Sequence, residues 1–278
     1  MKREPTSIAS TRIAFIGGGN MASALIGGLI QQGLGADRIT VVEPLAEQRA
    51  RLHSQFGVRT EPAAGAALQG CELVVWAVKP QVFKAVAQDC ATHVNGALHL
   101  SVAAGIRSDS IAAWLGSERI VRAMPNTPAL VGQGMTGLYA RPAVSAADRG
   151  LVDAVVDTTG QFLWVEREAE LDVVTALSGS GPAYVFYFLE AMRQAGTEMG
   201  LSAEIATRLA IGTFAGAARL AQDASEPPEV LRERVTSKGG TTYAALCSLE
   251  DSGVKASFIK ALHAAQDRAR ELGDEFGA

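Results

Sequence analysis

The segment RIAFIGGGNMA, residues 12–22, constrains the fold more than any other part of the chain. Residues 13–16 form a continuous apolar run, which is typical of a strand buried on both faces of a parallel sheet. Gly17, Gly19 and Ala22 follow with the spacing G-x-G-x-x-A. The first glycine permits a tight turn, the second lets a pyrophosphate approach the backbone, and the small third residue lets the next helix pack on the strand. A helix that begins near Asn20 would point its free N–H groups at the phosphates. The segment therefore predicts a dinucleotide site, and an ordinary tight turn is the alternative.

Composition indicates a globular chain with small-molecule partners. Its 278 residues are 48% hydrophobic and 19% charged, enough for a large core in one large or two modest domains. The formal net charge is -4 and there is no long basic run. We therefore expect no nucleic-acid partner and no acidic membrane surface as a partner.

The cysteines and the start of the chain bear on location. Cys71, Cys90 and Cys247 stand far apart without a CxxC pair, which suits a reducing compartment and gives no metal-site spacing. Residues 1–11 are polar, and no apolar run reaches the roughly 18 residues that span a bilayer. We expect a cytoplasmic protein without a metal site.

Apolar runs and helical segments alternate as far as residue 165. The expected strands are 13–16, 39–42, 73–77, 97–102, 119–123, 135–139 and 162–165, and the expected helices are 21–32, 45–56, 63–68, 81–93, 110–115 and 146–158. This alternation predicts an α/β fold with a Rossmann-type, doubly wound, mainly parallel sheet. We assign residues 1–166 to this dinucleotide-binding domain.

From residue 167 the periodicity becomes helical throughout. The expected helices are 171–177, 182–199, 203–222, 229–235, 243–249 and 255–272. Residues 178–182, SGSGP, interrupt this pattern before Pro182 opens a long helix. We assign residues 167–278 to an all-α domain for substrate binding and dimerisation.

Two charged residues follow expected strands. Glu43 lies about 20 residues beyond the glycine turn, where a dinucleotide fold places an acid on the adenosine ribose. Such an acid would repel a 2′-phosphate and favour NADH over NADPH. Lys79 follows the strand 73–77 at the ligand-binding edge. A solvated strand end and a solvated loop lysine are the alternatives.

Two loops carry hydrogen-bonding groups. Residues 124–128, MPNTP, follow an expected strand. They could form the floor of a nicotinamide pocket, or only a rigid connection. Residues 236–242, TSKGGTT, precede a helix. Paired glycines there could form a cup of N–H groups for a carboxylate, or a glycine-rich link between helices.

With these motifs in place, the chain closely resembles the Δ1-pyrroline-5-carboxylate reductases. The matching segments, in order, are IGGGNMA at 16–22, WAVKPQ at 76–81, SVAAGI at 101–106, RAMPNTPA at 122–129, LSGSGPAYV at 177–185 and VTSKGGTTYAAL at 235–246. The resemblance implies a two-domain enzyme that reduces a cyclic imine to L-proline with NADPH or NADH, the last step of proline biosynthesis. It also implies interlocked homodimers, and decamers built of five dimers.

The resemblance also implies roles for particular residues. The substrate carboxylate would lie on Ser237, Gly239, Gly240 and Thr241. The Thr242 hydroxyl would form a hydrogen bond with the ring nitrogen, and the Lys79 ammonium would add a positive electrostatic field at the site. The implied cofactor-binding residues are Gly17, Gly18, Gly19, Asn20, Met21, Glu43, Ala77, Val78, Lys79, Pro80, Ala103, Ala104, Met124, Asn126 and Thr127.

Two positions depart from the family pattern. Glu43 replaces a small polar residue and puts NADPH preference in doubt, and Lys238 stands where proline is usual. A protonated imine is already a good hydride acceptor, which fits the absence of a His/Asp constellation. Dehydrogenases of the 3-hydroxyacid or 6-phosphogluconate kind are the runner-up, but the helix after Pro182 lacks their lysine. A cofactor sensor without turnover is a further alternative.

Overall fold

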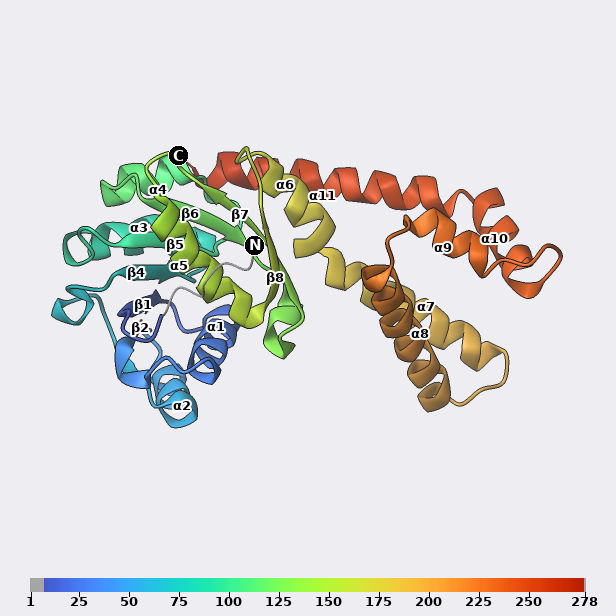
Figure 1. The fold of residues 1–278 in the computed structure, drawn as a ribbon, viewed down its shortest axis with the longest axis horizontal. Helices are drawn as coiled ribbons and strands as arrows, with labels where there is room; N and C mark the ends of the chain where they lie inside the picture. Colours follow the sequence, from blue (N-terminus) through green and yellow to red (C-terminus); the bar gives the residue numbers. More distant parts are fainter. Residues whose placement is uncertain (1–7, 278) are drawn as a thin grey trace. The chain divides into compact units, whose positions relative to one another are not determined.

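An eight-stranded sheet organises the first part of the chain (Figure 1). The structure is a computed structural model, and it describes residues 8–277. The strand order is β3-β2-β1-β4-β5-β6-β7-β8. The strands are β1 (Ile13–Ile16), β2 (Ile39–Val42), β3 (Arg59–Glu61), β4 (Leu73–Trp76), β5 (Leu98–Ser101), β6 (Ile120–Met124), β7 (Gly134–Ala140) and β8 (Gly160–Trp164). Strands β1 to β6 pair in parallel, and β7 pairs antiparallel with β6. This confirms the Rossmann-type, mainly parallel sheet.

Helices cover both faces of the sheet. Ile13 and Phe15 belong to one core cluster and Ala14 and Ile16 to the other, because successive side chains of a strand point to opposite faces. The first cluster also holds side chains of α1 (Asn20–Gln31), α2 (Ala46–Phe56) and α5 (Ala146–Val156). The second holds side chains of α3 (Pro80–Cys90) and α4 (Ser108–Leu115). The sheet is therefore doubly wound, as the alternation predicts.

The structure differs from the sequence prediction beside β2. The helix expected at 63–68 is wrong, since only Ala66–Leu68 form a single 3-10 turn. Before it lies the unexpected strand β3, whose Thr60 pairs with Val41. Its sequence, Arg-Thr-Glu, is polar because the strand forms a sheet edge, where charged residues discourage pairing with other chains. An apolar-run criterion cannot detect such a strand.

The later helices form a second compact unit, Gly181–Ala264, while the described residues 8–180 and 265–277 belong to the first. The second unit holds α7 (Gly181–Glu198), α8 (Ala203–Asp223), α9 (Pro228–Arg234), α10 (Thr241–Asp251) and the first part of α11 (Val254–Phe276). Helix α6 (Glu170–Val174) and the π-helical turn Thr175–Gly179 belong to the first unit. The all-helical character is confirmed. The predicted domain boundary at 166/167 stays a prediction. The compact units of the structure divide at 180/181 and again at 264/265.

Within residues 8–277, no helix combines the length and the apolar character that crossing a bilayer requires.

A buried histidine lies in the middle of the sheet. His99 on β5 is 1% exposed, and the Trp76 indole N–H donates to its Nδ1 at 3.3 Å. Burial, assisted by the positive charge of Arg119, lowers the pKa of His99 from 6.5 to about 4. The folded protein therefore holds this imidazole neutral.

This pKa predicts a loss of stability in acid. Between pH 6.5 and about 4 the unfolded chain binds a proton at His99 that the folded chain does not. The free energy of unfolding should therefore fall as pH falls through this window, by about 2 to 3 kcal/mol from this group. Urea unfolding of wild type and His99→Gln at pH 7 and pH 4.5 measures it. The variant should lose less stability on acidification, and an identical loss in both proteins would contradict the assignment.

Candidate functional site

The carboxyl ends of the parallel strands define the candidate site. The chain runs from β1 outward to β2 and β3 and then crosses to β4 on the other side of β1. Ligands of open α/β sheets bind at such a switch point. The Gly17 N–H donates to Val42 O and the Ala77 N–H to Ile16 O, both at 2.8 Å. The loops after β1, β2 and β4 are therefore tied together at this edge.

The glycine turn after β1 is packed on one side and open on the other. Gly17 has a φ of 94°, and a Cβ there would lie 2.6 Å from Ala77 O. A Cβ on Gly18 would lie 2.6 Å from Leu52 Cδ1, whereas a Cβ on Gly19 would meet nothing within 4 Å. Helix α1 begins at Asn20 without a side-chain cap. This open turn with free N–H groups fits a pyrophosphate.

A cleft of about 590 Å³ opens beside the glycine turn. Among the expected cofactor residues it brings together Gly17, Gly18, Gly19, Glu43, Ala77, Val78 and Lys79. Sequence reasoning missed several residues in its lining: Leu45, Pro62, Ala63, Ala64, Val82 and Val86. Residues 62–64 follow β3, so the strand-end rule would have found them had that strand been recognised.

The carboxylate of Glu43 is turned toward the backbone. Glu43 is 8% exposed, its Oε2 accepts from the Gly18 N–H at 2.9 Å, and its Oε1 accepts from the Leu45 N–H at 2.9 Å. The solvated strand end considered from sequence is therefore wrong. Contact with a ribose stays a prediction.

Lys79 and Pro80 lie where β4 gives way to α3. Lys79 is exposed and is the residue before the helix, and Pro80 is its first residue. Proline suits this position because its fixed φ matches the helix and the missing N–H has no helical partner there. Lys79 is thus held at the edge of the cleft by a defined helix start.

The remaining expected cofactor residues lie outside the lining of this cleft. Asn20 and Met21 form the first turn of α1. Ala103 and Ala104 follow β5, and Met124, Asn126 and Thr127 belong to the end of β6 and the loop after it. They therefore continue the same carboxyl edge of the sheet.

The side chain of Asn126 is already bonded to protein. Its Nδ2 donates to both the carbonyl oxygen and the Oγ of Ser178 at 3.2 Å, and its Oδ1 accepts from the Met135 N–H at 2.9 Å. Ser178 lies in the π-helical turn, a feature often found at functional sites. Asn126 therefore ties the loop after β6 to this turn.

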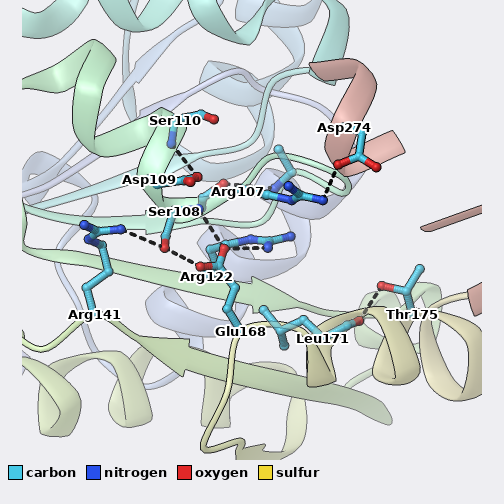
Figure 2. A network of polar contacts seen from close by, with 12 residues as sticks. Arg107, Ser108, Asp109, Ser110, Arg122, Arg141, Glu168, Leu171, Thr175 and Asp274 are labelled. Carbon is cyan, nitrogen blue, oxygen red and sulfur yellow. Dashed lines mark hydrogen bonds and ion pairs between the residues drawn. The ribbon is translucent and has the colours of Figure 1, made fainter. Parts of the chain in front are cut away.

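A polar network centred on Glu168 fixes two neighbouring elements (Figure 2). The Glu168 carboxylate accepts from the Ser108 N–H at 2.7 Å and from Arg122 Nη1 at 2.7 Å. The Arg122 side chain is only 9% exposed. Removing one partner of such an ion pair would leave a buried charge unpaired. The pair therefore locks the start of α4, just after Ala103 and Ala104, to β6.

The second glycine loop belongs to the helical unit. The Gly240 N–H donates to Ser237 O at 3.0 Å, and Gly239 has a φ of 76°. This fits a type II turn, in which proline is favoured where Lys238 stands. Helix α10 begins at Thr241 without a side-chain cap, and both Thr241 and Thr242 are exposed. The first turn of α10 thus offers N–H groups to an anion.

Metal ligation was not expected from the sequence. In the described part of the chain, no three His, Cys, Asp or Glu residues are grouped to hold an ion.

The fold and the cleft are those of a Rossmann-type nucleotide-binding domain. The family described as "NADP oxidoreductase coenzyme F420-dependent" matches residues 12–105, and "Pyrroline-5-carboxylate reductase dimerisation" matches residues 168–272. The pyrroline-5-carboxylate reductase of Pseudomonas aeruginosa is 46% identical over 272 residues, covering 97% of this chain and 100% of that protein. The chain belongs to the pyrroline-5-carboxylate reductase family.

Solved structures agree with this assignment. A pyrroline-5-carboxylate reductase from Coxiella burnetii superposes with a TM-score of 0.89 at 39% identity, covering 95% of this chain and 98% of that one. The Plasmodium falciparum pyrroline carboxylate reductase, solved with NADP bound, gives a TM-score of 0.86 at 28% identity, covering 96% and 100%. The family resemblance seen in the motifs is confirmed.

The two sides of the glycine turn predict different effects of adding one methyl group. Gly17→Ala should lower the free energy of unfolding by more than about 1 kcal/mol, because alanine is strained at positive φ. Gly19→Ala should change it by less than about 0.5 kcal/mol but weaken dinucleotide binding about tenfold or more, since the methyl group occupies the open side. Urea unfolding and calorimetric titration with NAD⁺ measure the two quantities. Undiminished binding by Gly19→Ala would exclude the open side as the pyrophosphate site.

Proposed function

We propose that this enzyme reduces Δ1-pyrroline-5-carboxylate, transferring a hydride from NADH or NADPH to the C=N carbon to give L-proline. This is the last step of proline biosynthesis. The observation that carries the proposal is the match to a pyrroline-5-carboxylate reductase at 46% identity over 97% of the chain. Both glycine loops support it, since each precedes a helix that has no side-chain cap.

The loop before α10 is suited to hold the substrate carboxylate. Gly239 and Thr241 supply backbone N–H groups beside the positive end of the helix dipole, Gly240 closes the turn with its own N–H, and Ser237 supplies a hydroxyl. All four are placed by the turn that Gly240 closes onto Ser237 O. We assign them to substrate binding.

Thr242 and Lys79 are the proposed catalytic residues. The exposed Thr242 hydroxyl is suited to bond the ring nitrogen, and the exposed Lys79 ammonium adds positive potential at the cleft. A nicotinamide would supply the hydride when bound, and a protonated imine would accept it without further activation. The chain contributes mainly orientation of the substrate.

The cofactor residues divide along the sheet edge. Gly17, Gly18, Gly19, Asn20 and Met21 form the pyrophosphate turn, and Ala77, Val78 and Pro80 follow the neighbouring strand β4. The proposed nicotinamide floor comprises Ala103, Ala104, Met124, Asn126 and Thr127. The side chain of Asn126 contributes through the position of its loop, because its amide already bonds Ser178 and Met135.

Glu43 favours NADH as the donor. Its buried carboxylate closes the end of β2, where a 2′-phosphate would meet a negative charge. Arg49, on α2, donates from its Nη1 to the carbonyl oxygens of Glu43 and Pro44 at 2.8 Å, so its guanidinium is already engaged by this loop. NADP is bound in the Plasmodium falciparum relative, so the preference needs direct comparison.

The proposed assembly is a homodimer. Residues 168–272 match the family's dimerisation domain, and large apolar side chains such as Tyr187, Leu209 and Leu220 are more than half exposed. A second copy would cover such side chains, and five dimers would form the decamer that the resemblance implies. The proposal places the enzyme in the cytoplasm, with a small-molecule substrate and no nucleic-acid or membrane partner.

Cofactor oxidation by the purified enzyme tests the function directly. With pyrroline-5-carboxylate present, the absorbance of NADH or NADPH at 340 nm should fall, and kcat/KM should be higher with NADH. Reactions without the imine are the control. No imine-dependent oxidation with either donor would refute the function. A preference for NADPH would refute only the role of Glu43.

Replacement of Thr242 tests its proposed contact. Thr242→Ala should lower kcat by about tenfold to a thousandfold, because a hydrogen bond made in the transition state is lost. Thr242→Ser keeps the hydroxyl and should retain most of the activity. Steady-state kinetics of the three proteins decides the matter, and wild-type turnover in Thr242→Ala would remove this residue from the mechanism.

A further inference from the structure

The Glu43 carboxylate is bonded to two different loops. Its Oε2 accepts from the Gly18 N–H in the turn after β1, and its Oε1 accepts from the Leu45 N–H in the loop after β2, both at 2.9 Å. Each bond joins a charged acceptor to a backbone donor, which makes it stronger than a neutral hydrogen bond. At 8% exposure, the carboxylate has little water to compete for it. Both oxygens are therefore engaged before any ligand arrives.

Helix α2 holds the same residue of the turn from another direction. Gln48 Nε2 donates to the Gly18 carbonyl oxygen. Leu52 Cδ1 lies so close that a Cβ on Gly18 would be 2.6 Å away. Gly18 is thus held at its N–H, its carbonyl and its Cα by three side chains from one segment of the chain. Its N–H is used by Glu43, which leaves the N–H groups at the start of α1 for a phosphate.

We propose that Glu43 and Gln48 are positioning residues that set the conformation of the pyrophosphate turn in the ligand-free enzyme. A turn ordered beforehand loses less conformational freedom when a ligand binds. Pyrophosphate affinity therefore depends on Glu43 even in a ligand that has no ribose hydroxyls. This inference rests on the proposed role of the turn as the dinucleotide site.

Positioning of the turn by Glu43 adds to ribose recognition by the same carboxylate and does not replace it. An ionised carboxylate has about four acceptor positions, and the two backbone donors use two of them. The remaining positions can accept from ribose hydroxyls. Because both oxygens are anchored, the charge cannot swing aside to admit a 2′-phosphate. Glu43 then acts on the cofactor in two separable ways, through the turn and through the ribose.

A comparison of two nucleotides separates these effects. Calorimetric titration of wild type, Glu43→Gln and Gln48→Leu with ADP and with 2′,3′-dideoxy-ADP gives the affinities. Loss of one strong hydrogen bond should weaken both ligands about tenfold in each variant. Glu43→Gln should weaken ADP more than dideoxy-ADP, since it also alters the ribose contact. Glu61→Gln, at the end of the neighbouring strand β3 and paired with Arg59, is the matched control and should bind as wild type.

The opposite pattern would overturn the proposal. If Glu43→Gln weakens ADP but leaves dideoxy-ADP unchanged, and Gln48→Leu weakens neither, then Glu43 acts on the ribose alone. Gln48→Leu does not change a charge, so the test stands even if Glu43→Gln fails to fold, which circular dichroism will show.

A measurement without ligand separates this inference from the proposed function. The Gly18 and Leu45 amide protons should resonate at unusually low field and move upfield in Glu43→Gln, as recorded by NMR of the ligand-free enzyme. If these shifts occur but wild type binds neither nucleotide, the dinucleotide site is refuted while the contact stands. If both amide signals are unchanged in the variant, the positioning role is refuted.

Discussion

The proposed function depends on unpaired backbone N–H groups at the start of α1. These groups lie at the carboxyl end of β1, a fully buried strand. Strand β1 lies between β2 and β4, and its four residues are at most 1% exposed. The glycine turn is therefore fixed by the sheet beneath it. Its open side faces away from that packing, as the free space around Gly19 shows. The proposed anion binding at this point would use backbone groups alone and would require no charged side chain.

The same arrangement occurs a second time in the helical unit. The turn before α10 presents N–H groups after a glycine at positive φ, again without a side-chain cap. Hydride transfer to a protonated imine needs two anionic ligands held in place more than it needs proton transfer. The pKa shifts of His99 and Cys90 arise mainly from burial of these side chains.

Much of the fold could be predicted because its signals are local. The apolar runs that became β1 and β4, and the glycines that require an open turn, are visible in the sequence itself. Strand β3 was not predicted because it lies at the edge of the sheet and its residues are polar. Residues 62–64, which follow it and line the cleft, were therefore not predicted either. The bonds of Glu43 to Gly18 and of Asn126 to Ser178 join residues far apart in sequence. No periodicity encodes such pairs.

The central claim is that one glycine turn holds the cofactor and the other holds the substrate carboxylate. The most direct measurement is a crystal structure of the enzyme with NAD⁺ and L-proline, its proposed product. The claim predicts pyrophosphate oxygens within hydrogen-bonding distance of the N–H groups of residues 19–21, and the proline carboxylate on the N–H groups of Gly239 and Thr241. A dinucleotide bound away from the first turn, or a proline bound away from the second, would contradict it.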